Sequence, residues 1–439
     1  MLHFSMKAGI CLGAIALASA MPAHAATEIE FWHAMSSQLG ERVDELAKKF
    51  NESQSDYVVK TVYKGSYDEI INGTIAAYRA KQQPEIVQVS ERGFLTMLYS
   101  GTILPAADLM KEHGYNVDWN GFLAPVIGYY SKDGKMYPMP FNSSTAILFY
   151  NKDHFKAAGF EEPGKTWQEF EKQLYVIKEK GIAKCGMGLP ADYEWSLIEN
   201  YDSVNDVPYA TKRNGLDGLD TEIVFNKTRL VQQVERLTKL YKDGILQIAG
   251  QGNTPIQLYT SGQCSTFPAS TATHAAVEAG AQFEWSATYL PHEEGVEPHN
   301  SVIGGAALWT LKGHSPEKYK AVAAFYNFLT DVDTQVWWHK VTGYVPITVA
   351  AYEKAKAEGY YKEKPTREIA ILQLMRPKQS DNSMGFRLGN GTQIIITLKE
   401  EVQAALIGKK SAQQALDDAA DRCNKILRQY ERINASKKL

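Results

Sequence analysis

Short apolar stretches alternate with amphipathic helical patterns near the start of the chain. Strands are expected at residues 28–33, 58–63 and 86–90, which are short and rich in bulky apolar residues. Between the first two, apolar residues recur at spacings of four, three and four, as on one face of a helix: Leu39, Val43, Leu46 and Phe50. A second helix is expected over residues 67–81. This alternation of strand and helix predicts a parallel sheet of the α/β class.

The rest of the chain continues with mixed elements. Asp133-Gly134 between aromatic residues predicts a β-hairpin, and Thr166 with Glu169 predicts a capping box at a helix start. Further strands are expected at residues 182–188 and 264–267. The C-terminal part is mostly helical, with helices expected at residues 348–358, 365–376, 392–407 and 411–430.

Residues 137–151 combine three patterns in a row. Two prolines, which favour extended backbone, are followed by the small polar residues 142–145 and then by a strongly apolar strand. We interpret this stretch as the chain leaving one domain and entering another, with hydroxyl groups and an amide where an interdomain ligand would meet them. The alternative is a polar loop before a core strand. Residues 343–346, with an aromatic residue and a proline, suggest another crossing.

Three features are candidates for ligand contact because of their place in the predicted elements. Glu91 follows a buried strand, and ligands of α/β sheets bind at the carboxyl ends of strands. It is equally well placed as a first-turn acid of the next helix. Residues 268–273 bring several hydroxyl groups to a helix start, which suits an anion, although Ser270 or Thr271 would also serve as an ordinary cap. Gly304-Gly305 would allow close approach of a ligand or a second backbone.

Length and charge limit the class of protein. The chain has 439 residues, enough for two domains, and a net charge of -3, which argues against a nucleic-acid partner. Residues 1–25 have a basic start, an apolar run and an Ala-x-Ala site, so we expect a cleaved secretory signal peptide without a lipid anchor. No later stretch is long and apolar enough to span a bilayer. Of the cysteines, Cys185, Cys264 and Cys423 would remain, and their spacing does not decide which two would form a disulfide.

Motifs of common enzymes are missing from the sequence. It contains no His-Glu-x-x-His, Gly-x-Ser-x-Gly or phosphate-loop pattern. The residues His292, Glu293, Glu294, Glu297 and His299 lie among prolines and glycines, and we interpret them as a surface loop without a metal. A binding protein is therefore favoured over an enzyme, with no catalytic residue, metal or cofactor expected.

Several blocks, in the same order along the chain, resemble the periplasmic solute-binding proteins of ABC importers, in particular those for glycerol phosphate compounds. The blocks cover essentially the whole chain after the signal peptide: residues 31–35 (FWHAM), 63–67 (YKGSY), 88–91 (QVSE), 140–145 (PFNSST), 214–218 (NGLDG), 303–306 (IGGA), 342–346 (TGYVP) and 387–390 (RLGN).

The resemblance implies an α/β fold with two lobes, of the maltose-binding-protein-like type II, joined by three crossings and closing around a ligand. The implied lobes are residues 26–141 with 305–343, and residues 142–304 with 344–439. The family's ligand contacts fall on Tyr67, Glu91, Ser144, Trp195, Ser270, Gly305 and Tyr344. The resemblance also implies that Cys185 and Cys264 share a lobe and form the disulfide.

Two departures from the family pattern bear on the ligand. Ile395 stands where the family has a phosphate-binding arginine, and Asp192 or Tyr193 stands where it has a second cleft tryptophan. Arg387 is a candidate to compensate. Ser144 is expected to contact the anion, and Asn142 and Ser143 to shape the hinge. The resemblance implies a monomeric periplasmic receptor that binds glycerol-3-phosphate or a glycerophosphodiester and delivers it to an inner-membrane ABC permease. A neutral sugar is the alternative ligand, and a periplasmic hydrolase the alternative class.

Overall fold

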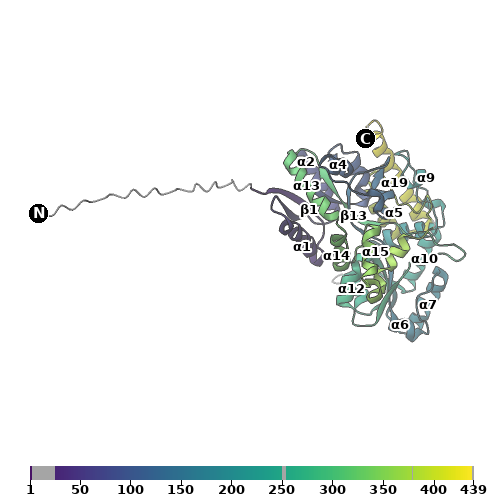
Figure 1. Cartoon of the computed structure of the whole chain (residues 1–439). Helices are drawn as coiled ribbons and strands as arrows, with labels where there is room; N and C mark the ends of the chain where they lie inside the picture. The colour runs from purple at the N-terminus through teal and green to yellow at the C-terminus, as the bar shows by residue number, and fades with distance from the viewer. Residues whose placement is uncertain (2–24, 250–253, 378, 438–439) are drawn as a thin grey trace.

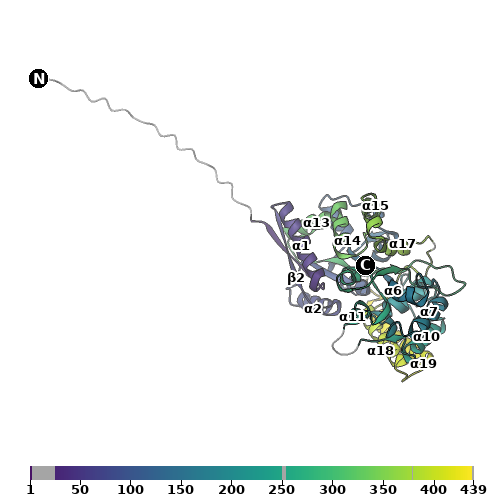
Figure 2. The ribbon, with the colours of Figure 1, turned by 90° about the horizontal axis from the view of Figure 1, so that it is seen from below.

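Two β-sheets, each with parallel and antiparallel strands, and the helices around them form the body of the protein in the computed structural model (Figure 1). The structure describes residues 1, 25–249, 254–377 and 379–437. The expected signal peptide, residues 1–25, lies almost entirely outside the described residues. Figure 2 shows α1, α2 and α13 toward one side of the body, and α6, α7, α10, α18 and α19 toward the other.

The first sheet has the order β2-β1-β3-β13-β4, with β7 paired to β13. Its strands are β1 (Thr27–His33), β2 (Tyr57–Tyr63), β3 (Ile86–Ser90), β4 (Ile103–Leu104), β7 (Met139–Ser144) and β13 (Gly304–Leu311). The three expected N-terminal strands are present, and β1 runs parallel to both β2 and β3. The predicted parallel pairing is confirmed for these three strands, but the sheet as a whole is mixed, because β13 comes from far along the chain and pairs antiparallel with β3, β4 and β7. Local alternation carries no information about such a distant strand.

The second sheet has the order β10-β9-β11-β8-β12. Its strands are β8 (Ala146–Asn151), β9 (Cys185–Gly188), β10 (Leu246–Gln247), β11 (Cys264–Ser270) and β12 (Trp285–Thr288). The expected hairpin at Asp133-Gly134 is confirmed as a separate pair, β5 (Ser131–Lys132) with β6 (Lys135–Met136). The chain passes from the first sheet to the second at Thr145, between β7 and β8, and returns between β12 and β13.

Helices of the first half cover the first sheet and are joined there by helices from after β13. They are α1 (Ser37–Ser53), α2 (Tyr67–Arg79), α3 (Phe94–Leu98), α4 (Ala106–Glu112), α5 (Ala124–Tyr130), α13 (Pro316–Thr330) and α14 (Val332–Thr342), with the short turns η1 (Glu91–Gly93) and η2 (Trp119–Gly121). Phe50 of α1 packs against Phe325 of α13 with ring centroids 5.2 Å apart. Segments separated by more than 250 residues therefore share one core with β1 and β2.

The second sheet is surrounded by the middle and the end of the chain. The elements before β13 are α6 (Lys152–Ala158), α7 (Trp167–Glu179), η3 (Trp195–Glu199), α8 (Asn200–Val204), α9 (Thr211–Asn214), η4 (Phe225–Lys227), α10 (Leu230–Lys242), α11 (Pro255–Thr260), η5 (Thr271–Thr273) and α12 (His274–Gly280). The later elements are α15 (Val349–Ala357), α16 (Tyr360–Glu363), η6 (Pro365–Arg367), α17 (Ile369–Leu374), α18 (Gly391–Leu406) and α19 (Ala412–Asn434). Of these, α15 packs on α14 and α16 rather than on the second sheet. Residues of α7, α10, α18 and α19 share a core with β8 and β9.

Local capping signals start several helices where the sequence predicts them. Thr166 accepts a hydrogen bond from the backbone N–H of Glu169, and the Glu169 carboxylate accepts one in return, which confirms the predicted capping box. Ser66 and Glu69 form the same reciprocal pair at the start of α2. Because a capping box satisfies free N–H groups at the helix end, it fixes where α2 begins and so where Tyr67 lies.

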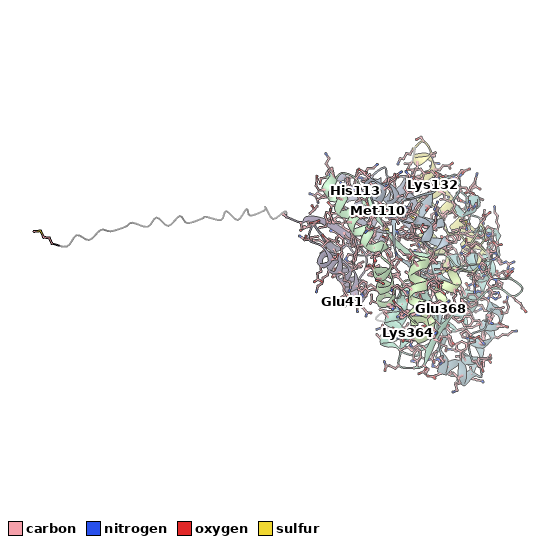
Figure 3. All side chains as sticks on the ribbon, in the orientation of Figure 1. Glu41, Met110, His113, Lys132, Lys364 and Glu368 are labelled. Atoms are coloured by element: carbon pink, nitrogen blue, oxygen red, sulfur yellow. A yellow bond between two sulfur atoms is a disulfide. The ribbon has the colours of Figure 1, made fainter. Side chains whose placement is uncertain are left out.

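The outer face is charged. Glu41 and Lys364 are exposed and lie at the surface in Figure 3. In the part of the chain that the structure describes, no helix has both the length and the apolar character needed to cross a membrane.

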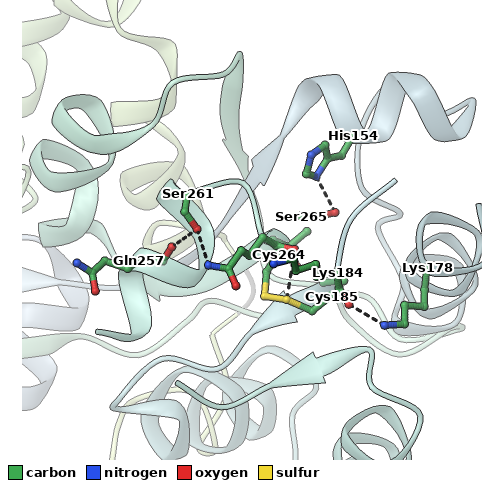
Figure 4. The surroundings of a disulfide bond; sticks show 11 residues. His154, Lys178, Lys184, Cys185, Gln257, Ser261, Cys264 and Ser265 are labelled. Carbon is green, nitrogen blue, oxygen red and sulfur yellow. Dashed lines mark hydrogen bonds between the residues drawn. A yellow bond between two sulfur atoms is a disulfide. The ribbon is translucent and has the colours of Figure 1, made fainter. Parts of the chain in front are cut away.

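A disulfide joins Cys185 at the start of β9 to Cys264 at the start of β11 (Figure 4). The two residues are direct partners in the register of these parallel strands, with Cα atoms 4.5 Å apart. The pairing implied by the family resemblance is thus confirmed, and Cys423 is a free, buried thiol.

The disulfide gives a first testable prediction. It links residues 79 positions apart, so replacing both cysteines by alanine should lower the free energy of unfolding by about 2–4 kcal/mol through the larger entropy of the unfolded chain. Urea denaturation measures this loss. Cys423→Ala is the control and should cost less, about 1 kcal/mol, since it removes only one buried sulfur. For the chain from residue 26, which lacks Cys11, a thiol count other than one in denaturant without reductant would contradict the pairing.

Candidate functional site

A cavity of about 600 Å³ lies between the two sheets. Ligand sites of globular proteins commonly have this size and lie between domains. Its walls come from both halves of the fold: Ser66, Tyr67, Asp68, Ser90, Glu91, Arg92, Ser144, Ala191, Asp192, Trp195, Ser270, Gly304, Gly305, Tyr344 and Lys399.

Seven of the eight residues expected to contact a ligand line this cavity. Tyr67 is the first residue of α2 and Glu91 the first of η1, so both follow strand ends of the first sheet. Ser144 and Ser270 are the last residues of β7 and β11. The remaining three are Trp195 at the start of η3, Gly305 in β13 and Tyr344 after α14. The strand-end rule locates Tyr67 and Glu91 by local position, and the tertiary fold brings all seven together.

Hydroxyl groups gather on one side of the cavity around Asn142. Its Nδ2 donates a hydrogen bond to the Tyr67 hydroxyl over 3.1 Å, and its Oδ1 accepts one of 2.8 Å from Gln88. Burial, together with the neighbouring Tyr344, raises the pKa of the Tyr67 hydroxyl well above its ordinary value. Burial also raises the pKa of Tyr344. Both phenols therefore keep their protons at neutral pH and can donate hydrogen bonds to anionic oxygens.

The apolar side of the cavity is built by Trp195 against a glycine pair. A Cβ on Gly304 would lie 2.4 Å from the Trp195 ring, so the indole packs directly on the backbone of β13. Gly305 has a φ of +95°, and a Cβ there would lie 1.9 Å from the carbonyl oxygen of Asn142. Only glycine fits both the left-handed backbone and this close approach. The sequence-based expectation of a close backbone contact at this pair is confirmed.

The sequence left two roles open for Glu91 and Ser270: a place at a helix start and contact with a ligand. Their positions are compatible with both. Glu91 begins a helical turn, η1, and also lines the cavity. Ser270 accepts a hydrogen bond from the backbone N–H of Ala272 as an ordinary cap and also lines the cavity. Thr271, in contrast, is buried and is not a lining residue. Only one hydroxyl of this helix start therefore faces the cavity.

Charged side chains also meet at the cavity wall, around Arg92. Its guanidinium lies 3.4 Å from a Glu194 oxygen, 3.5 Å from Glu91 and 4.0 Å from Glu199. Glu194 and Glu199, which are not lining residues, follow β9 of the second sheet, so this group joins the two halves of the fold. Lys399 of α18 adds a second cation, 3.9 Å from Glu194.

Burial raises the pKa values of these carboxylates. It raises the pKa of Glu91 to about 7 and that of Glu199 to about 8, although Arg92 opposes the change in both. The pKa values of Asp192 and Glu194 are raised for the same reason. Near neutral pH the group is therefore partly protonated, and its negative charge is smaller than the number of carboxylates suggests.

This carboxylate group predicts how stability depends on pH. In the unfolded chain Glu199 loses its proton near 4.5, whereas in the folded protein it keeps it up to about 8. Between these values the unfolded state binds fewer protons, so the free energy of unfolding should fall as pH rises. A pKa difference of one corresponds to about 1.4 kcal/mol. Urea midpoints from pH 5 to pH 8 should fall less in Glu199→Gln than in the wild type. Substitution of the exposed Glu235 by glutamine should leave the slope unchanged, and equal slopes in all three proteins would contradict the prediction.

Arg387, the eighth expected residue, does not line the cavity. Its guanidinium donates hydrogen bonds to the backbone oxygens of Gly128, Tyr129 and Ser131 and lies 4.6 Å from the centre of the Phe94 ring. With its donors occupied by carbonyl groups, Arg387 ties the chain before α18 to the end of α5. The expectation that it reaches the ligand is thus not supported, because sequence spacing does not show the direction of a long side chain.

The positions that depart from the family pattern differ in whether they line the cavity. Ile395 is buried on α18 and is not a lining residue, and Tyr193 is buried with its hydroxyl donating to the Lys399 carbonyl oxygen. Asp192, the alternative to Tyr193 at the second departure, does line the cavity.

Two charged lining residues, Arg92 and Lys399, were not among the expected contacts. Arg92 directly follows Glu91 and could have been found by the same strand-end argument. Lys399 lies inside a helix far along the chain, and no local signal marks it.

The residues from His292 to His299 include potential metal ligands in the sequence. Among the residues that the structure describes, no group of three or more His, Cys, Asp or Glu side chains could hold a metal ion. The segment is a loop, as interpreted, but one member is buried and another is held by close partners. Glu293 pairs with Arg236 at 2.7 Å and accepts a hydrogen bond from Tyr201, and His299 is buried.

Known sequences are similar to this chain over most of its length. The model of the bacterial extracellular solute-binding protein family matches residues 45–368. The sn-glycerol-3-phosphate-binding periplasmic protein UgpB of Rhizobium meliloti is 42% identical over 414 residues, which cover 93% of this chain and 96% of the relative. UgpB of Salmonella typhimurium is 39% identical over 429 residues, or 96% of this chain and 98% of the relative.

Solved structures share the fold. UgpB from Mycobacterium tuberculosis, in complex with glycerophosphocholine, has a TM-score of 0.79 at 22% identity and covers 92% of this chain and 99% of its own. The sugar-binding protein MalE from Xanthomonas citri has a TM-score of 0.72 at 17% identity and covers 94% and 100%. The expected α/β fold of maltose-binding-protein-like proteins is confirmed. From the extent of the family match and the identity to its members, the chain belongs to the bacterial extracellular solute-binding proteins.

Proposed function

We propose that this protein is the periplasmic receptor of an ABC importer for glycerol-3-phosphate or a glycerophosphodiester. The observation that carries the proposal is the convergence of Tyr67, Ser144, Ser270 and Tyr344 with Glu91 and Trp195 in one interdomain cavity. The relatives named as sn-glycerol-3-phosphate-binding proteins, and the structural neighbour that contains glycerophosphocholine, support this ligand class.

The chemistry of the cavity suits such a ligand. Hydroxyl groups of Ser144, Ser270, Tyr67 and Tyr344 are donors for phosphate oxygens. The Glu91 carboxylate is an acceptor for glycerol hydroxyl groups, and the Trp195 ring gives the carbon chain an apolar contact. Binding, rather than turnover, is the proposed activity. An inner-membrane permease is the proposed partner, and the receptor is proposed to act as a monomer.

The two sheets with their helices form the proposed lobes. Because β7 stays in the first sheet through Ser144, we place the first crossing at Thr145 rather than after residue 141. Hydrogen bonds fix Thr145. Its hydroxyl lies 2.7 Å from the Ser301 hydroxyl, and its carbonyl oxygen accepts a hydrogen bond from the backbone N–H of Thr271. The second crossing lies before Gly304, and the third at residues 343–346, where the Val345 N–H donates to the Ser143 carbonyl oxygen. Bending at these crossings would close the lobes on the ligand.

Calorimetry on the chain from residue 26 tests the proposal with three compounds: glycerol-3-phosphate, glycerophosphocholine and maltose. Saturable heat is expected with at least one of the two phosphate compounds and none with maltose. Heat with maltose alone would overturn the phosphate ligand in favour of a sugar. Release of free glycerol or choline during the titration would show an enzyme instead.

A further inference from the structure

We propose that Arg92 binds the phosphate group of the ligand, with two carboxylates of the other lobe, Glu194 and Glu199, beside its guanidinium. This inference rests on the function proposed above and names the cation of the anion subsite. Neither the expected Arg387 nor position 395 supplies a cation to this cavity, because neither residue lines it.

The first support is the incomplete coordination of the Arg92 guanidinium. Its Nε is buried, lies 3.5 Å from a Glu91 oxygen and makes no hydrogen bond in the protein, and Nη1 donates to Glu194 over a long 3.4 Å. Charge-assisted hydrogen bonds of arginine to carboxylates are usually about 2.7–2.9 Å long. The guanidinium therefore has free donor capacity at the cavity wall, in a side chain that is still 24% exposed.

Other buried arginines show the contrast. Arg236 makes a 2.7 Å contact with Glu293, and Arg387 donates to three backbone carbonyl groups. Arg236 also has an Nε without a hydrogen-bond acceptor, but its Nη1 and Nη2 both donate to Glu293. The contrast with Arg92 therefore lies in the Nη groups. Arg92 has three carboxylates around it, none closer than 3.4 Å, and they accept only one long hydrogen bond, from Nη1 to Glu194.

The charge of the surrounding carboxylates leaves room for an anion. The pKa values of Glu91 and Glu199 are raised to about 7 and about 8 by burial. Because these groups are partly protonated near neutral pH, they do not fully neutralise Arg92. A planar guanidinium with free donors matches two phosphate oxygens at once, which an ammonium group does not.

Lys399 is the other cation of the cavity and is less suited to this role. Its Nζ donates to the Ala191 carbonyl oxygen and lies 3.9 Å from Glu194, and its side chain is 40% exposed. An exposed ammonium contributes less to binding, since water screens its charge. Lys399→Met should therefore reduce the affinity less than a change at Arg92.

The test compares Arg92→Met, Arg92→Lys and the control Arg376→Met by calorimetry with glycerol-3-phosphate and glycerophosphocholine at one ionic strength. Arg376 is also partly buried, with a 3.1 Å hydrogen bond to the His299 carbonyl oxygen, but it is not a lining residue. Arg92→Met should weaken binding about 10–100-fold, the loss of hydrogen bonds to a charged group. The affinity of Arg92→Lys should lie between that of Arg92→Met and that of the wild type. Arg376→Met should have the affinity of the wild type. The phosphorus NMR resonance of the bound ligand should shift in Arg92→Lys but not in Arg376→Met.

If Arg92→Met does not fold, the double variant Arg92→Met/Glu199→Gln, which removes one opposite charge as well, provides the same comparison. Wild-type affinity in a folded variant without Arg92 would overturn this inference and leave the proposed function standing. A wild-type protein that binds neither phosphate compound would overturn the proposed function, and the inference with it.

Discussion

Gly305→Ala is expected to lower the affinity for the ligand at least tenfold and the free energy of unfolding by about 2–4 kcal/mol. The added Cβ would lie 1.9 Å from the Asn142 carbonyl oxygen, a contact with backbone that no side-chain rotation relieves. Left-handed backbone strain of about 1 kcal/mol adds to an overpacking cost of about 1–3 kcal/mol. Because β7 would have to move, Ser144 and the Asn142–Tyr67 hydrogen bond would be displaced together.

Gly159 provides a matched control for this prediction. It has the same φ of +95°, but a Cβ there would have no atom within 4 Å. Gly159→Ala should therefore cost about 1 kcal/mol of backbone strain and leave the affinity unchanged. Urea denaturation and calorimetry measure the two effects. If the two alanine variants lose equal stability and bind equally well, the close approach at Gly305 has no functional role.

Trp195→Ala is the second substitution with a large expected effect. The ring is 4% exposed and packs against Ala146, Leu290 and Val302, so its removal should cost about 3–5 kcal/mol of stability. It also lines the cavity beside Gly304. Loss of its contact with the carbon chain of the ligand should weaken binding at least tenfold, about 1.4 kcal/mol or more.

Trp167→Ala separates these two effects. Trp167 is 2% exposed and packs on Phe170 in the core of the second sheet, and it is not a cavity residue. Its replacement should cost a similar amount of stability, measured by urea denaturation, with no change in affinity by calorimetry. Equal losses of affinity in both variants would show that Trp195 acts only through the fold.

Local structure followed from local sequence signals. The strand at residues 86–90, the hairpin at Asp133-Gly134 and the capping box of Thr166 with Glu169 lie where they were predicted. Each of these signals is complete within a few residues, because it depends on short hydrogen-bonded patterns or on alternation of apolar residues. The position of Glu91 at a strand end follows in the same way. The larger set of site residues and the disulfide came from the resemblance to a family rather than from spacing.

The sequence by itself thus determined the α/β class, most elements and the residues at strand ends. Only the tertiary structure decided which of them meet. It inserted β13 antiparallel beside β3, buried Arg387 against backbone carbonyl groups, and brought Arg92 and Lys399 to one cavity from positions 307 residues apart. The physical reason is that burial, strand partners and side-chain direction depend on contacts between distant segments, which no pattern within a short window encodes.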